Sequence, residues 1–213
     1  MDNKTKRLIR LIKKAQTEYA EDYLVVAIPG FLSKKFIAYC AMREDLKKTL
    51  EYIKLLGTDV NPIIKSALTY SLIALYGKCY TDASKNNFPK LEPKNLFKDD
   101  NQLKEVHNFL MDLRHQFIAH RGDTESEIGV SFMVIPKKEG VEQSQVSFSQ
   151  VKLNAFSPEE LAKIMTLINY TIEYLEQVIQ KNGQKVYEVF FDMFTPEQIA
   201  LMLMNNAKEH IDR

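Results

Sequence analysis

The chain has 213 residues, of which 45% are hydrophobic, so it can bury a substantial core without disulfide bonds. Its 29 basic and 28 acidic residues nearly cancel, which excludes a strong whole-molecule attraction to a polyanion. Any nucleic-acid contact must therefore come from a local patch.

Cysteine usage and hydropathy indicate the cellular compartment in which we expect the chain. Cys40 and Cys79 lie far apart without a pattern, which favours reduced thiols in a cytoplasmic protein. No continuous apolar signal segment follows the basic residues near the N-terminus. The apolar stretch 24–32 is too short to span a bilayer and contains Pro29-Gly30. We therefore expect a soluble, cytoplasmic chain with no membrane partner.

Helical periodicity dominates the first eighty residues. Apolar residues recur at helical spacing over 8–19, and the same segment carries six Lys and Arg residues between positions 4 and 14. We interpret this basic face as a solvated outer surface, with a track for RNA as the alternative. The pattern predicts a second helix over 33–56 and a third over 63–80, which opens with an Asn61-Pro62 cap and is apolar nearly all round.

The middle of the chain changes character twice. Residues 81–100 combine three Asn, two Pro and many charges, and are predicted to form a long loop. A helix is predicted over 101–121. Alternating apolar residues then predict a two-stranded hairpin over 128–153, with a bulge where the alternation slips at Val151 and Leu153.

The last sixty residues are predicted to be helical. Ser157-Pro158-Glu159-Glu160 matches a capping box and opens a helix to about Lys181. A further helical segment is expected over 185–194, and a second capping box at 195–198 starts a last helix to about residue 210. With no repeat or linker, the prediction is one domain over 1–213: an all-α, up-and-down helical bundle with a small hairpin insertion.

Residues 113–121, with the sequence LRHQFIAHR, are the strongest hint of chemistry in the chain. Arg114 and His120 are six residues apart, which in a straight α-helix places them about 120° apart around the axis and about 9 Å along it. They converge poorly within one helix. Two copies meeting at a two-fold axis would bring the Arg of one beside the His of the other, so the spacing favours a homodimer.

Arg and His at one point suit metal-free RNA cleavage. An Arg binds phosphate with paired hydrogen bonds and offsets developing charge, while a His moves a proton near neutral pH. The carbonyls at the helix end favour a charged His120 and the neighbouring arginines oppose it, so the direction of its pKa shift stays open. The alternative is structural, because basic residues are common in the last turn of any helix.

The string Arg114-His115 followed by His120, together with the helix 63–80 before it, resembles the motif of the HEPN superfamily (higher eukaryotes and prokaryotes nucleotide-binding domains), in its abortive-infection branch. The likeness is local and covers 63–122. The resemblance implies a helical bundle that dimerises through the motif helices. It also implies a metal-independent endoribonuclease in which Arg114, His115 and His120 are catalytic. Such enzymes act as toxins or in phage defence.

The resemblance leaves substrate and partners open. Arg121 is adjacent to the motif and is a candidate for substrate binding to phosphate. A cognate antitoxin is a possible partner, and the alternative function is a non-catalytic dimeric module that binds a nucleotide, RNA or protein. No metal or cofactor is expected, because His107 and His115 lack the spacing of a helical zinc pair and no phosphate-binding glycine loop is present.

Overall fold

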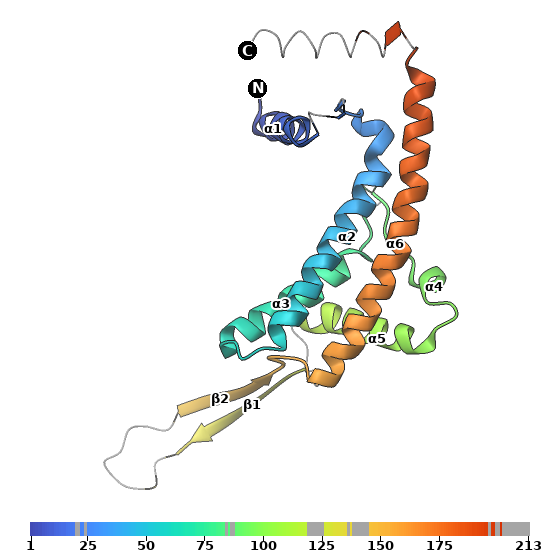
Figure 1. The fold of residues 1–213 in the computed structure, drawn as a ribbon. Helices are drawn as coiled ribbons and strands as arrows, with labels where there is room; N and C mark the ends of the chain where they lie inside the picture. Colours follow the sequence, from blue (N-terminus) through green and yellow to red (C-terminus); the bar gives the residue numbers. More distant parts are fainter. Residues whose placement is uncertain are drawn as a thin grey trace. The chain divides into compact units, whose positions relative to one another are not determined.

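The structure is a computed structural model that describes residues 1–19, 22–23, 25–83, 85, 88–118, 126–135, 137, 145–195, 197–198 and 201. These residues are mostly helical with one two-stranded antiparallel sheet, which confirms the predicted combination of helices and a hairpin (Figure 1). The elements in chain order are α1 (Asn3–Glu18), α2 (Gly30–Leu56), α3 (Pro62–Lys78), α4 (Pro93–Leu96), α5 (Asn101–Asp112), the π-helix η2 (Leu113–Ile118), β1 (Glu127–Val134), β2 (Gln145–Lys152) and α6 (Pro158–Met193).

The chain divides into two compact units. Unit 1 consists of Met1–Ile37 and Ile179–Arg213, and unit 2 consists of Ala38–Val178. The long helices α2 and α6 each contribute to both units. Among the described residues, no helix is both long and apolar enough to cross a membrane.

Unit 2 contains nearly all of the buried apolar side chains. They come from α2, α3, α5 and α6 and from the segment around α4. Those with a relative exposure of 0 or 1% include Leu46, Leu72, Ile73, Tyr76, Phe97, Leu110, Ile164, Leu167, Ile168 and Leu175. Burial of side chains of this size supplies most of the free energy of folding, so unit 2 is the part of the molecule that holds the motif helix in place.

Three predicted helix starts are confirmed by their hydrogen bonds. The side chain of Asn61 accepts from the backbone N–H of Ile63 at 2.9 Å. At the start of α6, Glu160 accepts from the N–H of Ser157 at 2.7 Å, and Ser157 accepts from the N–H of Glu160 at 3.2 Å. The same reciprocal pair forms at Thr195–Gln198. Each pair satisfies N–H groups that the first helical turn leaves without partners.

The predicted end of a helix near Lys181 is wrong, because α6 continues without a break to Met193. Gly183 lies inside this helix, where glycine is unfavourable by about 1 kcal/mol relative to alanine. Its small size has a packing reason in unit 1. A Cβ atom at Gly183 would lie 3.2 Å from Cε2 of Phe36, so the bare backbone permits the two helices to approach there.

The predicted loop over 81–100 contains a short helix. Pro93 occupies the first turn of α4, and Leu96 and Phe97 at its end are buried. The backbone N–H of Leu91 donates to the carbonyl of Cys79 at 2.9 Å. The segment is therefore folded back onto the end of α3, which its polar composition did not indicate.

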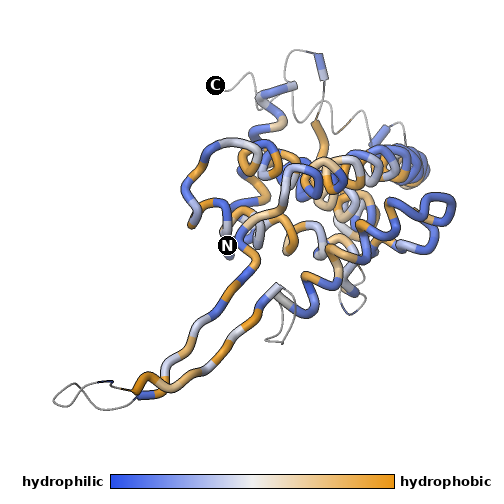
Figure 2. Tube along the Cα trace, turned by 90° about the horizontal axis from the view of Figure 1, so that it is seen from below, coloured by the Kyte–Doolittle hydropathy of each residue, from blue (hydrophilic) through white to orange (hydrophobic). Residues whose placement is uncertain are grey.

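The hairpin has no bulge at Val151. Eight consecutive residues of β1 pair with β2, from Glu127 opposite Lys152 to Val134 opposite Gln145, and Val151 pairs with Ile128. The apparent slip arises because both faces of the ribbon carry apolar residues, with Phe148 on one face and Val151 on the other. Figure 2 shows hydrophobic residues along both strands.

The motif helix also departs from the prediction. Residues 101–112 are α-helical, but Leu113–Ile118 form a π-helix instead of continuing the α-helix to Arg121. A π-helix bonds each N–H to the carbonyl five residues earlier, which is rare and is often found at functional sites. The apolar period of the sequence does not reveal the widened turn. Residues 119–125, at the predicted helix end, lie outside the described residues.

Candidate functional site

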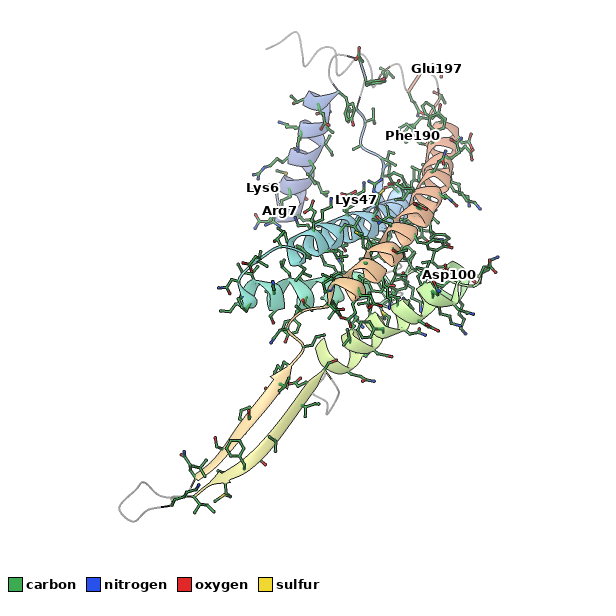
Figure 3. All side chains as sticks on the ribbon, turned by 60° about the horizontal axis from the view of Figure 1, so that its bottom comes forward. Lys6, Arg7, Lys47, Asp100, Phe190 and Glu197 are labelled. Carbon is green, nitrogen blue, oxygen red and sulfur yellow. The ribbon has the colours of Figure 1, made fainter. Side chains whose placement is uncertain are left out.

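The start and the buried face of α5 fix the position of the motif. Asp100, labelled in Figure 3, accepts a hydrogen bond from the N–H of Leu103 at 2.9 Å and caps the helix. Leu103, His107 and Leu110 are buried at helical spacing. Leu113 continues this buried seam into η2, with 6% of its surface exposed. Leu110 and Leu113 therefore belong to one buried apolar side of the motif helix.

Arg114 is half-buried and lies across α3 at Gly77. A Cβ atom at Gly77 would overlap Cδ of Arg114 and would lie 2.7 Å from its Nε and 3.1 Å from its Cγ. The absence of a side chain at Gly77 is therefore what gives Arg114 its space. The sequence offered no sign of this contact, because a glycine inside a helix does not reveal which distant residue packs on it.

The other predicted site residues are placed differently. His115 is exposed, one residue beyond Arg114 in η2. His120 and Arg121 lie outside the described residues. The angle and rise expected between Arg114 and His120 assumed a straight α-helix, and this assumption is wrong for the π-helical part of the interval.

Arg114 carries a charge that the described residues leave uncompensated. No carboxylate within the described parts of the chain forms an ion pair with it. A half-buried guanidinium without a carboxylate can bind an anion with paired hydrogen bonds. Arg114 is therefore the described residue best suited to hold a phosphate.

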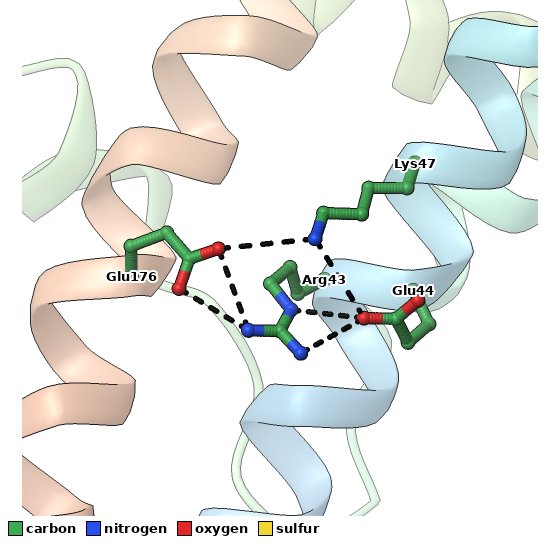
Figure 4. Close-up of polar contacts among 4 residues, drawn as sticks. All are labelled: Arg43, Glu44, Lys47 and Glu176. Atoms are coloured by element: carbon green, nitrogen blue, oxygen red, sulfur yellow. Dashed lines mark hydrogen bonds and ion pairs between the residues drawn. The ribbon is translucent and has the colours of Figure 1, made fainter.

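Arg43 and Lys47 show the contrasting case within unit 2. Arg43 bonds Glu176 of α6 at 3.2 Å and Glu44 at 2.9 Å (Figure 4). Lys47 lies 3.9 Å from Glu44 and 4.0 Å from Glu176. The two cations are matched by two carboxylates, so this cluster joins α2 to α6 and is not a site for an anion.

A buried polar contact near the motif joins α3 to α5, the helix that η2 continues. The Tyr76 hydroxyl lies 2.7 Å from Nδ1 of His107, and the ring of Tyr80 packs on His107 with centroids 4.5 Å apart. The ring of Phe97 also packs against His107, with ring centroids 5.2 Å apart. Since Tyr76 directly precedes Gly77, this contact holds α3 against α5 next to the position that Arg114 occupies.

The side chains of His107, Tyr76 and Tyr80 stay neutral near pH 7. Burial lowers the pKa of His107 to about 4, and burial raises the pKa values of Tyr76 and Tyr80 well above 10. An imidazole with such a low pKa is not a suitable proton carrier near neutrality. His107 was expected to play no part in a metal site, and we assign it a packing role.

A groove of about 560 Å³ lies between α5 and α6 in unit 2. Its lining includes Leu103, Phe109 and Ile164, with Glu160 and Lys163 also present. Lys163 forms an ion pair with Glu159 at 2.7 Å. Among the described residues that line the groove, no cation is left without a carboxylate, so Arg114 is the better candidate for an anion.

Neither comparison with known proteins nor a search for metal ligands identifies a function. Comparisons with protein-family models, curated proteins and solved structures found no match. Within the described residues, no group of His, Cys, Asp and Glu side chains is arranged to hold a metal ion. The case for a function therefore depends on the motif and on the geometry around Arg114.

Proposed function

We propose that the chain is a metal-independent endoribonuclease of the HEPN type. Its site would combine Arg114 and His115 with His120 across a homodimer interface, and Arg121 would contact substrate phosphate. A role as a toxin or in phage defence, with a cognate antitoxin as partner, belongs to the same proposal.

The main support for the proposal is the environment of Arg114. The residue lies in a π-helical turn, is half-buried against Gly77, and has no carboxylate partner among the described residues. A restrained guanidinium loses little side-chain freedom when it binds phosphate. Preorganised positive charge is also what a phosphoryl-transfer transition state requires.

The proposed reaction needs only the RNA and protein side chains. The 2′-oxygen attacks the adjacent phosphorus and the bond to the 5′-oxygen breaks, which leaves a 2′,3′-cyclic phosphate and a 5′-hydroxyl end. His120 moves a proton between these oxygens, and Arg114 stabilises the additional charge on the phosphate. His115 orients the RNA or assists proton transfer.

A non-catalytic binding module is the second candidate, and the hairpin supports it. Five apolar residues share one face of this ribbon: Ile128, Val130, Phe132, Val134 and Val151. Each is between 42 and 74% exposed. Solvent-exposed apolar patches are typical of surfaces that bind a partner, and a module of this kind would use Arg114 for binding alone.

The test is cleavage of end-labelled RNA in excess EDTA by wild type, Arg114→Ala, His120→Ala and Lys104→Ala. Lys104 is an exposed cation on α5 away from the motif and serves as the matched control. We expect wild type and Lys104→Ala to cleave and leave cyclic phosphate ends. Arg114→Ala and His120→Ala should each lose at least about a hundredfold in rate, the usual scale for one general acid–base or charge-stabilising group.

Two other results would contradict the nuclease proposal. Equal cleavage by all four proteins would show that the motif is not the active site. Absence of cleavage on transfer, messenger and total RNA, with RNA binding lost only in Arg114→Ala, would establish the binding module. Circular dichroism of each variant checks that loss of cleavage does not come from unfolding.

A further inference from the structure

Helix α1 has an apolar side and a cationic side, and no residue of this helix is buried in unit 1. Leu8, Leu11, Ile12 and Ala15 lie along one side of α1 at a spacing of about 100° per residue. Leu8 is 50% exposed and Leu11 is 64% exposed, whereas Ile12 and Ala15 are half-buried, so the part of the apolar side formed by the two leucines faces solvent.

The opposite side of α1 is positively charged. Lys6, Arg7, Arg10, Lys13 and Lys14 lie on this side and all five are exposed, whereas Lys4 in the first turn lies in line with the apolar side. Figure 3 labels Lys6 and Arg7 on α1. Glu18 is the only acidic residue of the helix.

These five cations differ from Arg43 and Lys47 of unit 2 in their lack of ion pairs with any residue that the structure describes. Among the described residues, none of the five forms an ion pair, whereas Arg43 and Lys47 are matched by carboxylates. The chain has a formal net charge of only +1, so five unpaired cations on one helix are a local excess. A complementary partner must therefore be anionic.

We infer that α1 is an interfacial helix that docks on an anionic lipid surface, with Leu8 and Leu11 among the acyl chains and its cations on the headgroups. Arg7 and Lys13 stand at the two borders of the apolar side, where their stems reach headgroups while the apolar side is immersed. Such a helix lies in the membrane plane and does not cross it, consistent with its short length. This inference does not depend on the proposed nuclease activity, and it replaces the expectation from the sequence that the chain has no membrane partner.

Two other occupants fit the pattern less well. RNA would satisfy the cations but would leave Leu8 and Leu11 in water. An apolar groove on a protein would cover the leucines but would leave the cations on the far side without partners. A lipid surface satisfies both sides of the helix, because it offers negative headgroups directly above an apolar layer.

The experiment is vesicle flotation with the full chain, on phosphatidylcholine alone and on phosphatidylcholine mixed with phosphatidylglycerol. Leu8→Gln/Leu11→Gln removes apolar contact and keeps every charge, and glutamine retains helix propensity. Lys6→Gln/Arg10→Gln removes two cations. The matched controls are Ile63→Gln, an 80% exposed apolar residue of α3, and Lys94→Gln/Lys104→Gln, two exposed cations of unit 2.

Wild type should bind the mixed vesicles and bind phosphatidylcholine alone at least about tenfold more weakly. The leucine variant should lose at least about tenfold in partition coefficient. The lysine–arginine variant should lose a similar factor and much of the salt dependence. Both controls should bind like wild type.

Other outcomes overturn the inference. Wild type that ignores anionic vesicles, or a leucine variant that binds as well as wild type, excludes a lipid-docking helix. Gel-shift binding of RNA that depends on Lys6 and Arg10, without vesicle binding, would assign the helix to RNA. Conversion of a dimer to a monomer by the leucine substitutions, again without vesicle binding, would assign it to a second copy of the chain.

Discussion

At the residue scale, the contact between Gly77 and Arg114 predicts that the effect of Gly77→Ala on stability depends on whether Arg114 is present. In a helix, alanine is more favourable than glycine by up to about 1 kcal/mol. In wild type, however, the new Cβ would overlap Arg114, and its three nearest atoms all belong to that side chain. Gly77→Ala should therefore stabilise the Arg114→Ala variant by up to about 1 kcal/mol, and should stabilise wild type much less or destabilise it.

Urea unfolding of the four proteins of this cycle measures the coupling between the two positions, which should be at least about 0.5 kcal/mol for side chains in direct contact. The same change in unfolding free energy in both backgrounds would show that Arg114 does not lie over Gly77 in solution. If the proposed nuclease activity is present, Gly77→Ala should also lower the cleavage rate, because it displaces the guanidinium.

The residues around this contact mark the limit of prediction from sequence. Arg114 was identified from a local string, since its neighbours in the chain carry the motif. Gly77 and Tyr76 were not, because their role depends on which helix packs against α3, and hydropathy does not encode that choice. The burial of His107 against Tyr76 became apparent only in the fold.

At the element scale, the capping box of α6 predicts a measurable share of stability. Ser157 and Glu160 exchange two hydrogen bonds at the N-terminus of α6, and one side of the first half of this helix is buried in unit 2. Ser157→Ala should lower the free energy of unfolding by about 1 kcal/mol. Thr166→Ala is the matched control: it removes an exposed hydroxyl that donates to the carbonyl of Ala162 within the same helix.

The control should be neutral or stabilising by about half a kcal/mol, because alanine has the higher helix propensity. Equal losses for both variants in chemical denaturation would mean that the capping box contributes nothing specific. Helix starts were predictable here because their signals are local side chains. The continuation of α6 through Gly183 was not, since it depends on packing against Phe36, and the false bulge at Val151 arose from apolar residues on both faces of the ribbon.

At the scale of the whole molecule, the two units differ in how much apolar surface they bury. Within α6, the side chains of Ile164, Leu167, Ile168 and Leu175 in unit 2 are at most 1% exposed. The part of the same helix in unit 1 has only Ile179 and Val186 classed as buried, at 7 and 9%. Local stability follows this kind of difference, because opening a segment exposes whatever apolar surface it buries.

Hydrogen exchange should therefore vary along a helix that is continuous in its backbone. We expect amides over 179–190 to exchange at least about tenfold faster than those over 164–175, with the last turn excluded because helix ends fray. Mass spectrometry of overlapping peptides measures both stretches in one sample, so pH and temperature are shared. Equal protection along α6 would show that the two units open together as one cooperative structure. A gradient would mean that unit 1, which carries the cationic helix α1, rearranges at a free-energy cost below that of unfolding the core that holds Arg114.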